Sequence, residues 1–207
     1  TYCATAWYHN RVADKGESLE AFLDEVRAFT ENEYTLALMK GDQLSEAERD
    51  RTAQKLSDLS GLSKDYWLKA DLRVKNREFF AELLREKGRV VGRLDSRFTG
   101  FAEDLLSQNA ATDPQSNAIS PPYIAAFKDY LYNALGVRRD LTYMTSSGLR
   151  DNFKWDWRHR GNIAWNAQVT ISTLPDMTTA MKRNPNLKIL ILNGYYDIAT
   201  VFYGVEY

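Results

Sequence analysis

Amphipathic segments bounded by helix-ending residues fill the middle of this 207-residue sequence, from about residue 17 to about residue 136. The first of them, residues 17–29, reads ESLEAFLDEVRAF. Its apolar residues recur every three or four positions and therefore share one helical face: Leu19, Phe22, Leu23, Val26 and Phe29. Charged residues occupy the opposite face, as in a helix that packs on a core with its other side in water. This periodicity predicts a mainly α fold.

Residues that cap helices mark where the later helices of this region begin and end. Ser45 and Glu48 have the spacing of a capping box, in which each side chain bonds a backbone N–H of the first turn. Further helix starts are predicted at Ser63, Asn76 and Ser120, and helix ends at Gly61, Gly88 and Gly136. Pro121 suits the first position of the last helix, because the N–H that proline lacks would have no partner there. Helix and loop lengths differ, so no repeat architecture is predicted.

The two ends of the sequence, and residues 88–98 within it, differ from this helical pattern. Residues 2–9 combine aromatic and small residues without helix caps, and residues 88–98 suit a short extended piece. A short helix is predicted between Pro175 and Pro185, directly before the apolar run of residues 187–192, LKILIL. A helix, a short loop and an apolar run are typical of an α/β unit whose strand is buried on both faces. Such a strand cannot stand alone, so we expect its partner strands mostly outside this chain.

The charge balance argues against two classes of partner. The sequence has 27 lysines and arginines against 28 aspartates and glutamates, a formal net charge of -1. Nucleic acids and anionic membrane surfaces are bound through a marked basic excess, which this sequence lacks. The sequence contains no run of about 18 apolar residues, so no membrane helix is predicted. Its start, TYCATAWYHN, lacks the pattern of a signal peptide. We expect neither nucleic acid nor membrane as a partner.

Residues with metal-binding or redox chemistry are few. The single cysteine, Cys3, excludes an internal disulfide and a thiolate cluster. The two histidines, His9 and His159, have no second ligand at the spacing of a helical metal site. A histidine in an aromatic context such as AWYHN is more often packed than catalytic, and we interpret His9 in that way. The sequence therefore predicts no metal and no cofactor.

Three other segments carry reactive or charged residues, and each favours a structural interpretation. TSSGL, residues 145–149, lacks the glycine that precedes the serine of a nucleophile elbow, so a turn or a helix cap is favoured. KWDWRHRGN, residues 154–162, places tryptophans beside arginines, but its aspartate and the slightly acidic chain favour a packed loop over a nucleic-acid site. GRLDSRFTG alternates Arg93, Asp95 and Arg97 and predicts a local salt-bridged surface.

Asp197 is the candidate catalytic residue. It follows the apolar run by a few positions, after the residues NGYY. In open α/β sheets, catalytic groups gather beyond the carboxyl ends of the strands. An aspartate in that place can orient a histidine, hold its tautomer and stabilise the imidazolium during acyl transfer. An aspartate that only shapes a turn is the alternative.

Separated stretches of the sequence share a family resemblance: ATAWYHNR, LSGLSKDYWLKADLR, GRVVGRLDSRFTG, AISPPYIAAFKDYL and NPNLKILILNGYYD. In this order they resemble segments of the serine carboxypeptidase family, in particular of its bacterial branch. The final stretch, LKILILNGYYDIATVFYGVEY, is similar to the segment that holds the acid residue of that family. The resemblance implies an α/β-hydrolase fold with an inserted helical cap, or lid, and a catalytic order of Ser, Asp, His along the chain.

The resemblance assigns one catalytic position to this chain. The aspartate of the family's acid loop corresponds to Asp197, and Val201 stands where the family usually has proline. The nucleophilic serine is expected upstream of Thr1 and the catalytic histidine downstream of Tyr207. The resemblance therefore implies an internal fragment that is inactive by itself.

The resemblance also implies a division of the chain and an activity for its parent. Residues 1–16 come from the hydrolase core, residues 17–150 form the helical cap, and residues 151–207 return to the core with the strand and turn of Asp197. The parent enzyme removes C-terminal residues from peptide substrates through an acyl-enzyme, without metal or organic cofactor. Secretion or a periplasmic location is expected of such a bacterial enzyme. The residues that bind the peptide's terminal carboxylate are expected mainly outside this chain.

Two other functions remain open at the level of sequence. A non-enzymatic helical interaction module needs no nucleophile or base, and it predicts a closed surface around residues 187–192. An α/β hydrolase that acts on esters or amides other than peptides would use the same triad, and only substrate profiling of the complete enzyme would separate it from a carboxypeptidase.

Overall fold

The computed structural model of the chain describes residues 1–140, 142–145, 153–154 and 172–207. These residues are mainly helical, and the sheet that they contain has two strands. The mainly α class expected from the sequence is confirmed. The chain divides into two compact units, residues 1–123 with 193–207 and residues 124–192. The division at residues 16 and 150 into core, cap and core stays a prediction.

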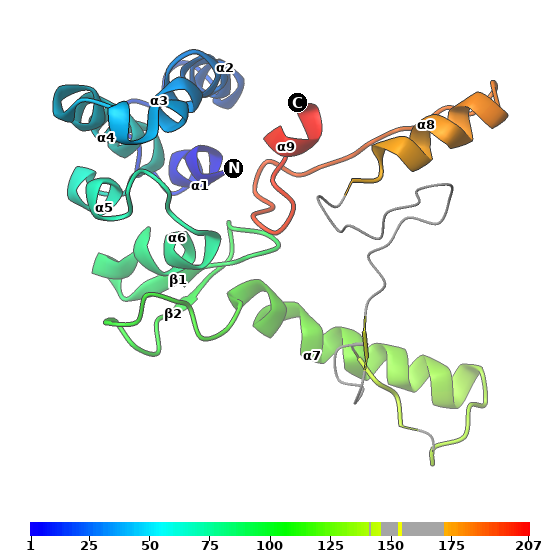
Figure 1. Cartoon of the computed structure of the whole chain (residues 1–207). Coiled ribbons are helices and arrows are strands. Elements are labelled where there is room, and N and C mark those ends of the chain that lie inside the picture. Colours follow the sequence, from blue (N-terminus) through cyan, green and yellow to red (C-terminus); the bar gives the residue numbers. More distant parts are fainter. Residues whose placement is uncertain (141, 146–152, 155–171) are drawn as a thin grey trace. The chain divides into compact units, whose positions relative to one another are not determined.

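The first unit contains most of the helices (Figure 1). They are α1 (Tyr2–Tyr8), α2 (Leu19–Phe29), α3 (Thr35–Lys40), α4 (Glu46–Ser60), α5 (Lys64–Lys69), α6 (Asn76–Glu82) and α9 (Tyr203–Glu206). Shorter π or 3-10 segments are η1 (Thr30–Tyr34), η2 (Gly41–Gln43) and η3 (Arg85–Lys87). Strands β1 (Arg89–Val91) and β2 (Thr99–Phe101) pair antiparallel, with Val90 opposite Gly100. The extended piece expected within residues 88–98 is thus present.

The remaining helices of the described residues lie partly or wholly outside the first unit. Helix α7 (Pro114–Asp129) crosses the sequence boundary between the two units and continues as the π segment η4 (Tyr130–Ala134). Helix α8 (Leu174–Arg183) belongs to the second unit and has Pro175 in its first turn, as expected.

Local capping signals account for the ends of α4 and α5. The Ser45 hydroxyl accepts the Glu48 N–H at 3.3 Å, and the Glu48 carboxylate accepts the Ser45 N–H at 3.0 Å, which completes the predicted capping box. Helix α4 ends at Gly61, whose φ of 73° lies in the left-handed region that favours glycine. The Ser63 hydroxyl then accepts the Tyr66 N–H and caps α5. These predicted caps are confirmed.

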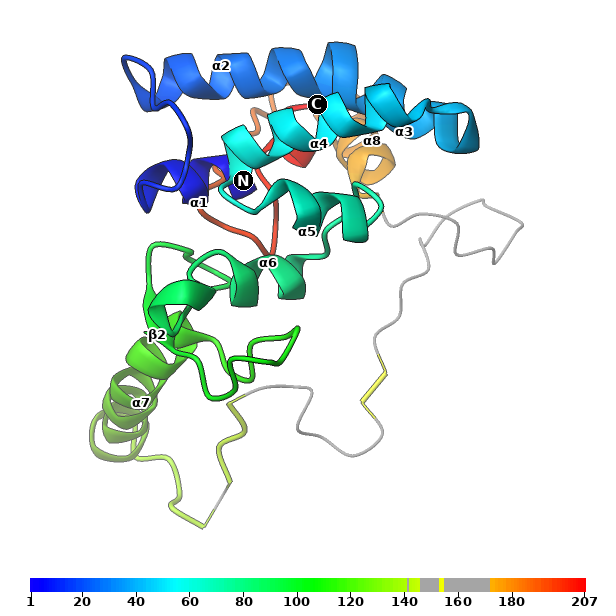
Figure 2. The same cartoon turned by 90° about the vertical axis from the view of Figure 1, so that its left-hand side faces the viewer.

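Residues 2–9 carry no helix-capping signals in the sequence, yet the structure forms helix α1 there. The structure has no side-chain cap at its start either. The helix is stabilised by packing, because Ala4, Thr5 and Ala6 are buried and α1 contacts both α2 and α4. Figure 2 shows these three helices together in the first unit.

The predicted start of the 120–136 helix at Ser120 was wrong. The first residue of helix α7 is Pro114, seven residues before the expected first residue Pro121, and the helix runs through Pro121 and Pro122. Asp113 and Pro114 repeat the same signal, a capping residue followed by proline, and the Asp113 carboxylate accepts the Gln115 N–H at 3.1 Å. The earlier of the two equivalent signals therefore begins the helix.

Residues 187–192 do not form the predicted buried strand in this structure. They adopt no strand or helix, and Leu190 and Leu192 are 82% and 83% exposed. A strand is defined by hydrogen bonds to a neighbouring strand, and no segment of the described ranges pairs with this run. The apolar run is left in contact with water.

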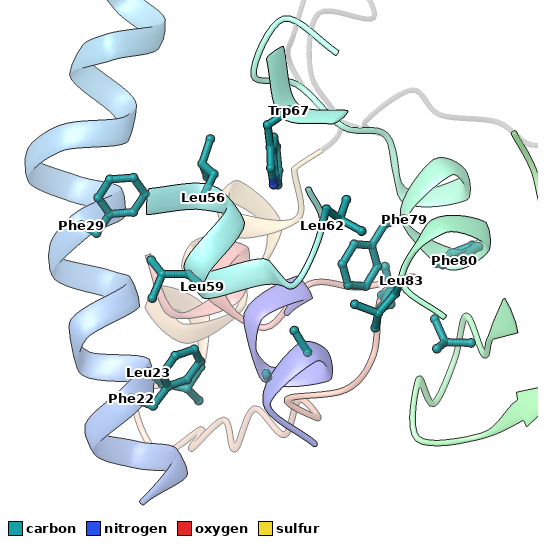
Figure 3. Packing of buried hydrophobic residues seen from close by; sticks show 14 of the residues in the cluster. Phe22, Leu23, Phe29, Leu56, Leu59, Leu62, Trp67, Phe79, Phe80 and Leu83 are labelled. Carbon is teal, nitrogen blue, oxygen red and sulfur yellow. The ribbon is translucent and has the colours of Figure 1, made fainter. Parts of the chain in front are cut away.

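A single hydrophobic cluster forms the core of the first unit. Figure 3 shows side chains of α2, among them Phe29 and Leu23, pointing toward Leu56 and Leu59 of α4. The largest members of the cluster are Phe22, Leu23, Phe29, Leu56, Leu59, Leu62, Trp67, Leu72, Phe79, Phe80, Leu83, Leu84, Ile198 and Phe202. The last two come from the C-terminal segment, so residues 193–207 pack into the same core.

Replacing Leu23 by alanine should lower the free energy of unfolding by about 2–5 kcal/mol, because the lost methyl groups leave a cavity in the core. Leu23 is 1% exposed in α2. The matched control is Leu36→Ala in α3, where the side chain is 53% exposed and the expected change is below about 0.5 kcal/mol. Urea unfolding followed by tryptophan fluorescence measures both variants. Equal losses would contradict the core assigned to α2.

Candidate functional site

Asp197 lies in a hydrogen-bonded turn, here called the Asp197 turn (residues 194–200). Its N–H donates to the Gly194 carbonyl at 3.2 Å. Its carboxylate oxygen Oδ1 accepts the N–H groups of Ala199 at 2.8 Å and Thr200 at 2.9 Å. Within the described part of the chain, the second oxygen, Oδ2, accepts no hydrogen bond. One oxygen of the carboxylate is therefore fixed, and the other oxygen is free to accept a hydrogen bond.

Backbone hydrogen bonds hold the Asp197 turn against the loop that follows β1. The Ile198 N–H donates to the Arg93 carbonyl at 3.0 Å, and the Ser96 N–H donates to the Tyr196 carbonyl at 3.0 Å. Ile198 is 0% exposed and belongs to the core cluster. The residues on either side of Asp197 are thus fixed by hydrogen bonds and by burial, while Asp197 itself remains partly exposed.

A side chain from α6 adds a third contact to the turn. The Asn76 amide Nδ2 donates to the Ile198 carbonyl at 2.9 Å. The sequence interpretation of Asn76 as a helix N-cap was wrong, because Lys75 occupies the cap position and Asn76 is the first helical residue. Its partner lies 122 positions away, so no local signal in the sequence could have revealed the contact.

The loop that follows β1 is also bonded to α1 and to His9 through Ser96. The Thr5 and Ser96 hydroxyls are both buried and lie 2.6 Å apart. The His9 ring nitrogen Nε2 lies 2.8 Å from the Ser96 carbonyl, which can only accept, so Nε2 carries the hydrogen and donates it. His9 is partly buried in this contact. It is a packed histidine, as the aromatic context of the sequence suggests.

The salt bridge predicted for GRLDSRFTG is present beside the turn. The Arg97 guanidinium lies 2.7 Å from the Asp95 carboxylate, and its hydrogen bonds lower the pKa of Asp95 from the ordinary value. The same guanidinium lies 5.1 Å from the centre of the Tyr196 ring, within the range of a cation–π contact. Arg97 is therefore already paired with Asp95, and it covers the Tyr196 ring at the surface of the turn.

An apolar cavity of about 420 Å³ opens in the first unit. Its walls include Leu23, Phe29, Leu56, Leu59, Trp67 and Phe202. Cys3 borders it, and burial raises the pKa of the Cys3 thiol to about 11. The thiol is therefore protonated at neutral pH, and it is a poor nucleophile or metal ligand in that form.

The other residues singled out from the sequence form no further site within the described residues. Ser146, Ser147 and residues 155–162 of KWDWRHRGN, with His159, lie outside the ranges that the structure describes. Within those ranges, no three His, Cys, Asp or Glu side chains group as a metal ion would require. No helix there combines the length and apolar character needed to cross a membrane.

Comparisons with known proteins do not add to this picture. Neither models of protein families nor curated protein sequences match the chain significantly, and no solved structure does so either. The geometry of the Asp197 turn and the resemblance of the sequence are therefore the two grounds for assigning a function.

The pKa of His9 should lie below its ordinary value of 6.5, chiefly because burial disfavours the charged ring. The folded protein then binds this proton less tightly than the unfolded chain does. The stability contributed by neutral His9 is present above pH 6.5 and is lost as the pH falls from there toward the lowered pKa. The destabilisation caused by His9→Gln should therefore be larger at about pH 7.5 than at about pH 5.5. Ring 15N shifts measured by NMR give the pKa directly, and a value at or above 6.5 would contradict the expected burial.

Proposed function

We propose that this chain supplies the helical cap and the acid residue of a serine-type carboxypeptidase, with Asp197 as the aspartate of a Ser-Asp-His triad. The serine and the histidine are assigned, by the resemblance of the sequence, to positions upstream of Thr1 and downstream of Tyr207. The substrate is a peptide, which loses residues from its C-terminus through an acyl-enzyme. Residues 1–207 by themselves are inactive in this proposal, and no cofactor takes part.

The observation that carries the proposal is the asymmetric bonding of the Asp197 carboxylate. A triad aspartate must stay ionised and oriented while one of its oxygens accepts the Nδ1–H of the histidine. Here, Oδ1 is held by the N–H groups of Ala199 and Thr200. Oδ2 has no hydrogen-bond partner within the described residues, so it can accept a hydrogen bond from the Nδ1–H of the histidine.

In that role, Asp197 acts on the histidine and not on the substrate. Its carboxylate holds the neutral imidazole in the tautomer whose Nε2 can take the serine proton. As the serine attacks the peptide carbonyl, the imidazole becomes positively charged, and the fixed carboxylate stabilises that charge. The backbone donors to Oδ1 keep the carboxylate from rotating away from the histidine.

The exposed apolar run supports the same proposal. Ile189, Leu190, Ile191 and Leu192 are all exposed, directly before the Asp197 turn. Strand partners from a hydrolase core would cover these side chains and pair with their backbone. A non-enzymatic helical module predicts instead a closed surface around residues 187–192, and the exposure counts against it.

Substrate class and location follow from the resemblance. Esters or amides other than peptides remain the second candidate substrates, because the same triad would act on them. A secreted or periplasmic location is proposed for the parent enzyme on the family resemblance. The net charge of -1 argues against nucleic acid and anionic membranes as partners.

The test uses the parent polypeptide, in which residues 1–207 are extended by the coding sequence on both sides. Asp197→Asn should lower kcat for release of a peptide's C-terminal residue by about 10⁴-fold, because the amide favours the wrong histidine tautomer. Asp71→Asn is the matched control; Asp71 pairs with Arg49 on the surface, and kcat should not change. Release of amino acids measured by mass spectrometry follows both variants.

Two outcomes would overturn the proposal. One is full activity in Asp197→Asn. The other is an extended coding sequence without a serine in a glycine-x-serine-x-glycine setting upstream, or without a histidine downstream. Cleavage of esters but not of peptides by the parent would favour the second candidate substrates.

A further inference from the structure

We propose that Asn76 is a positioning residue for Asp197, because its side-chain amide fixes the peptide group that binds the Asp197 carboxylate. The catalytic consequence rests on the proposed function. The hydrogen-bonded contact itself does not, since it is present within residues 1–207 and can be measured there.

The contact acts through one planar peptide unit. The carbonyl of Ile198 and the N–H of Ala199 belong to the same peptide group, and no peptide bond in the described chain is cis. In a trans peptide these two groups point in opposite directions within one plane. Asn76 Nδ2 binds the carbonyl at 2.9 Å, and Asp197 Oδ1 binds the N–H at 2.8 Å. Holding the carbonyl therefore aims the N–H at the carboxylate.

The orientation of the Asn76 amide is itself fixed from the core. Its oxygen, Oδ1, accepts the Tyr2 hydroxyl at 2.6 Å, which leaves Nδ2 for Ile198. Burial raises the pKa of Tyr2 far above neutral pH, so this hydroxyl keeps the proton that it donates. The Tyr2 ring stacks on the fully buried ring of Phe79, with 4.1 Å between the ring centroids. A continuous chain of contacts thus runs from the core to Asp197.

The side chain of Asn76 has this role in place of a helix cap. Asn76 is the first residue of α6, and the Lys75 N–H before it is bonded by Glu78. The backbone contacts that hold the turn come from Arg93 and Ser96, and a change of side chain does not remove their hydrogen-bonding groups. The burial of Ile198 and the bond from the Asn193 side chain to the Thr200 carbonyl are also left in place when Asn76 is changed. Substitution at Asn76 therefore isolates one support of the turn.

Asn76→Asp separates positioning from a merely structural role. The substituted side chain has nearly the same shape, but it cannot donate to the Ile198 carbonyl. A carboxylate in the first turn of a helix is favoured by the helix dipole, so α6 should not be destabilised. A role confined to the start of α6 predicts an unchanged Asp197 turn, whereas the positioning role predicts a loosened one.

The first measurement is amide hydrogen exchange by NMR on residues 1–207. In Asn76→Asp and Asn76→Ala, the Ala199 and Thr200 amides should exchange about tenfold faster, with the melting temperature of Asn76→Asp unchanged. Tyr2→Phe keeps the ring and loses the hydroxyl, and its effect should be smaller. The matched control is Asn32→Ala, because Asn32 is exposed and bonds within its own helical segment. Unchanged exchange in both Asn76 variants would overturn the proposal.

The second measurement is steady-state kinetics in the parent polypeptide. Asn76→Asp should lower kcat by about tenfold to a hundredfold with KM unchanged, and it should add little to Asp197→Asn, since both act through the same carboxylate. If Asp197→Asn lowers kcat and Asn76→Asp does not, the positioning role is overturned while the proposed function stands. If neither variant lowers kcat, the proposed function itself has failed.

Discussion

Close packing around the short helix α1 is the constraint on which the first unit depends. Ala4 and Ala6 are fully buried and have the smallest side chains that still favour a helix, so neighbouring helices can approach the α1 backbone closely. The polar side chains of α1 point to other elements: Tyr2 bonds Asn76 of α6, and the buried Thr5 hydroxyl bonds Ser96 in the loop after β1. The core and the supports of the candidate site therefore share one helix.

This arrangement couples stability to the geometry of a carboxylate. Ile198 is buried in the core and adjoins Asp197, so the core determines where the Asp197 turn lies. Hydrogen bonds from the loop after β1 and from Asn76 then fix how the turn is oriented. The aspartate of a catalytic triad requires this combination, because a carboxylate that rotates freely cannot hold a histidine in one tautomer.

Two features of the described residues lack the partners that their chemistry calls for. Asp197 Oδ2 accepts no hydrogen bond there, and the apolar side chains of residues 189–192 face water. Exposed apolar runs of this kind are costly in water and mark surfaces that another segment covers. The carboxypeptidase proposal accounts for both, since a triad histidine would bind the oxygen and strands of the hydrolase core would cover the apolar run.

The sequence by itself predicts Asp197 as the candidate acid, and it determined the features that depend on neighbouring residues: the mainly α class, the capping box at Ser45 and the left-handed helix end at Gly61. It misplaced the start of α7, because two equivalent capping signals lie seven residues apart. Only the tertiary structure decided that residues 2–8 are helical, since that helix is stabilised by burial and not by caps. It also decided that Asn76 supports the Asp197 turn, because the two positions meet only after the chain has folded.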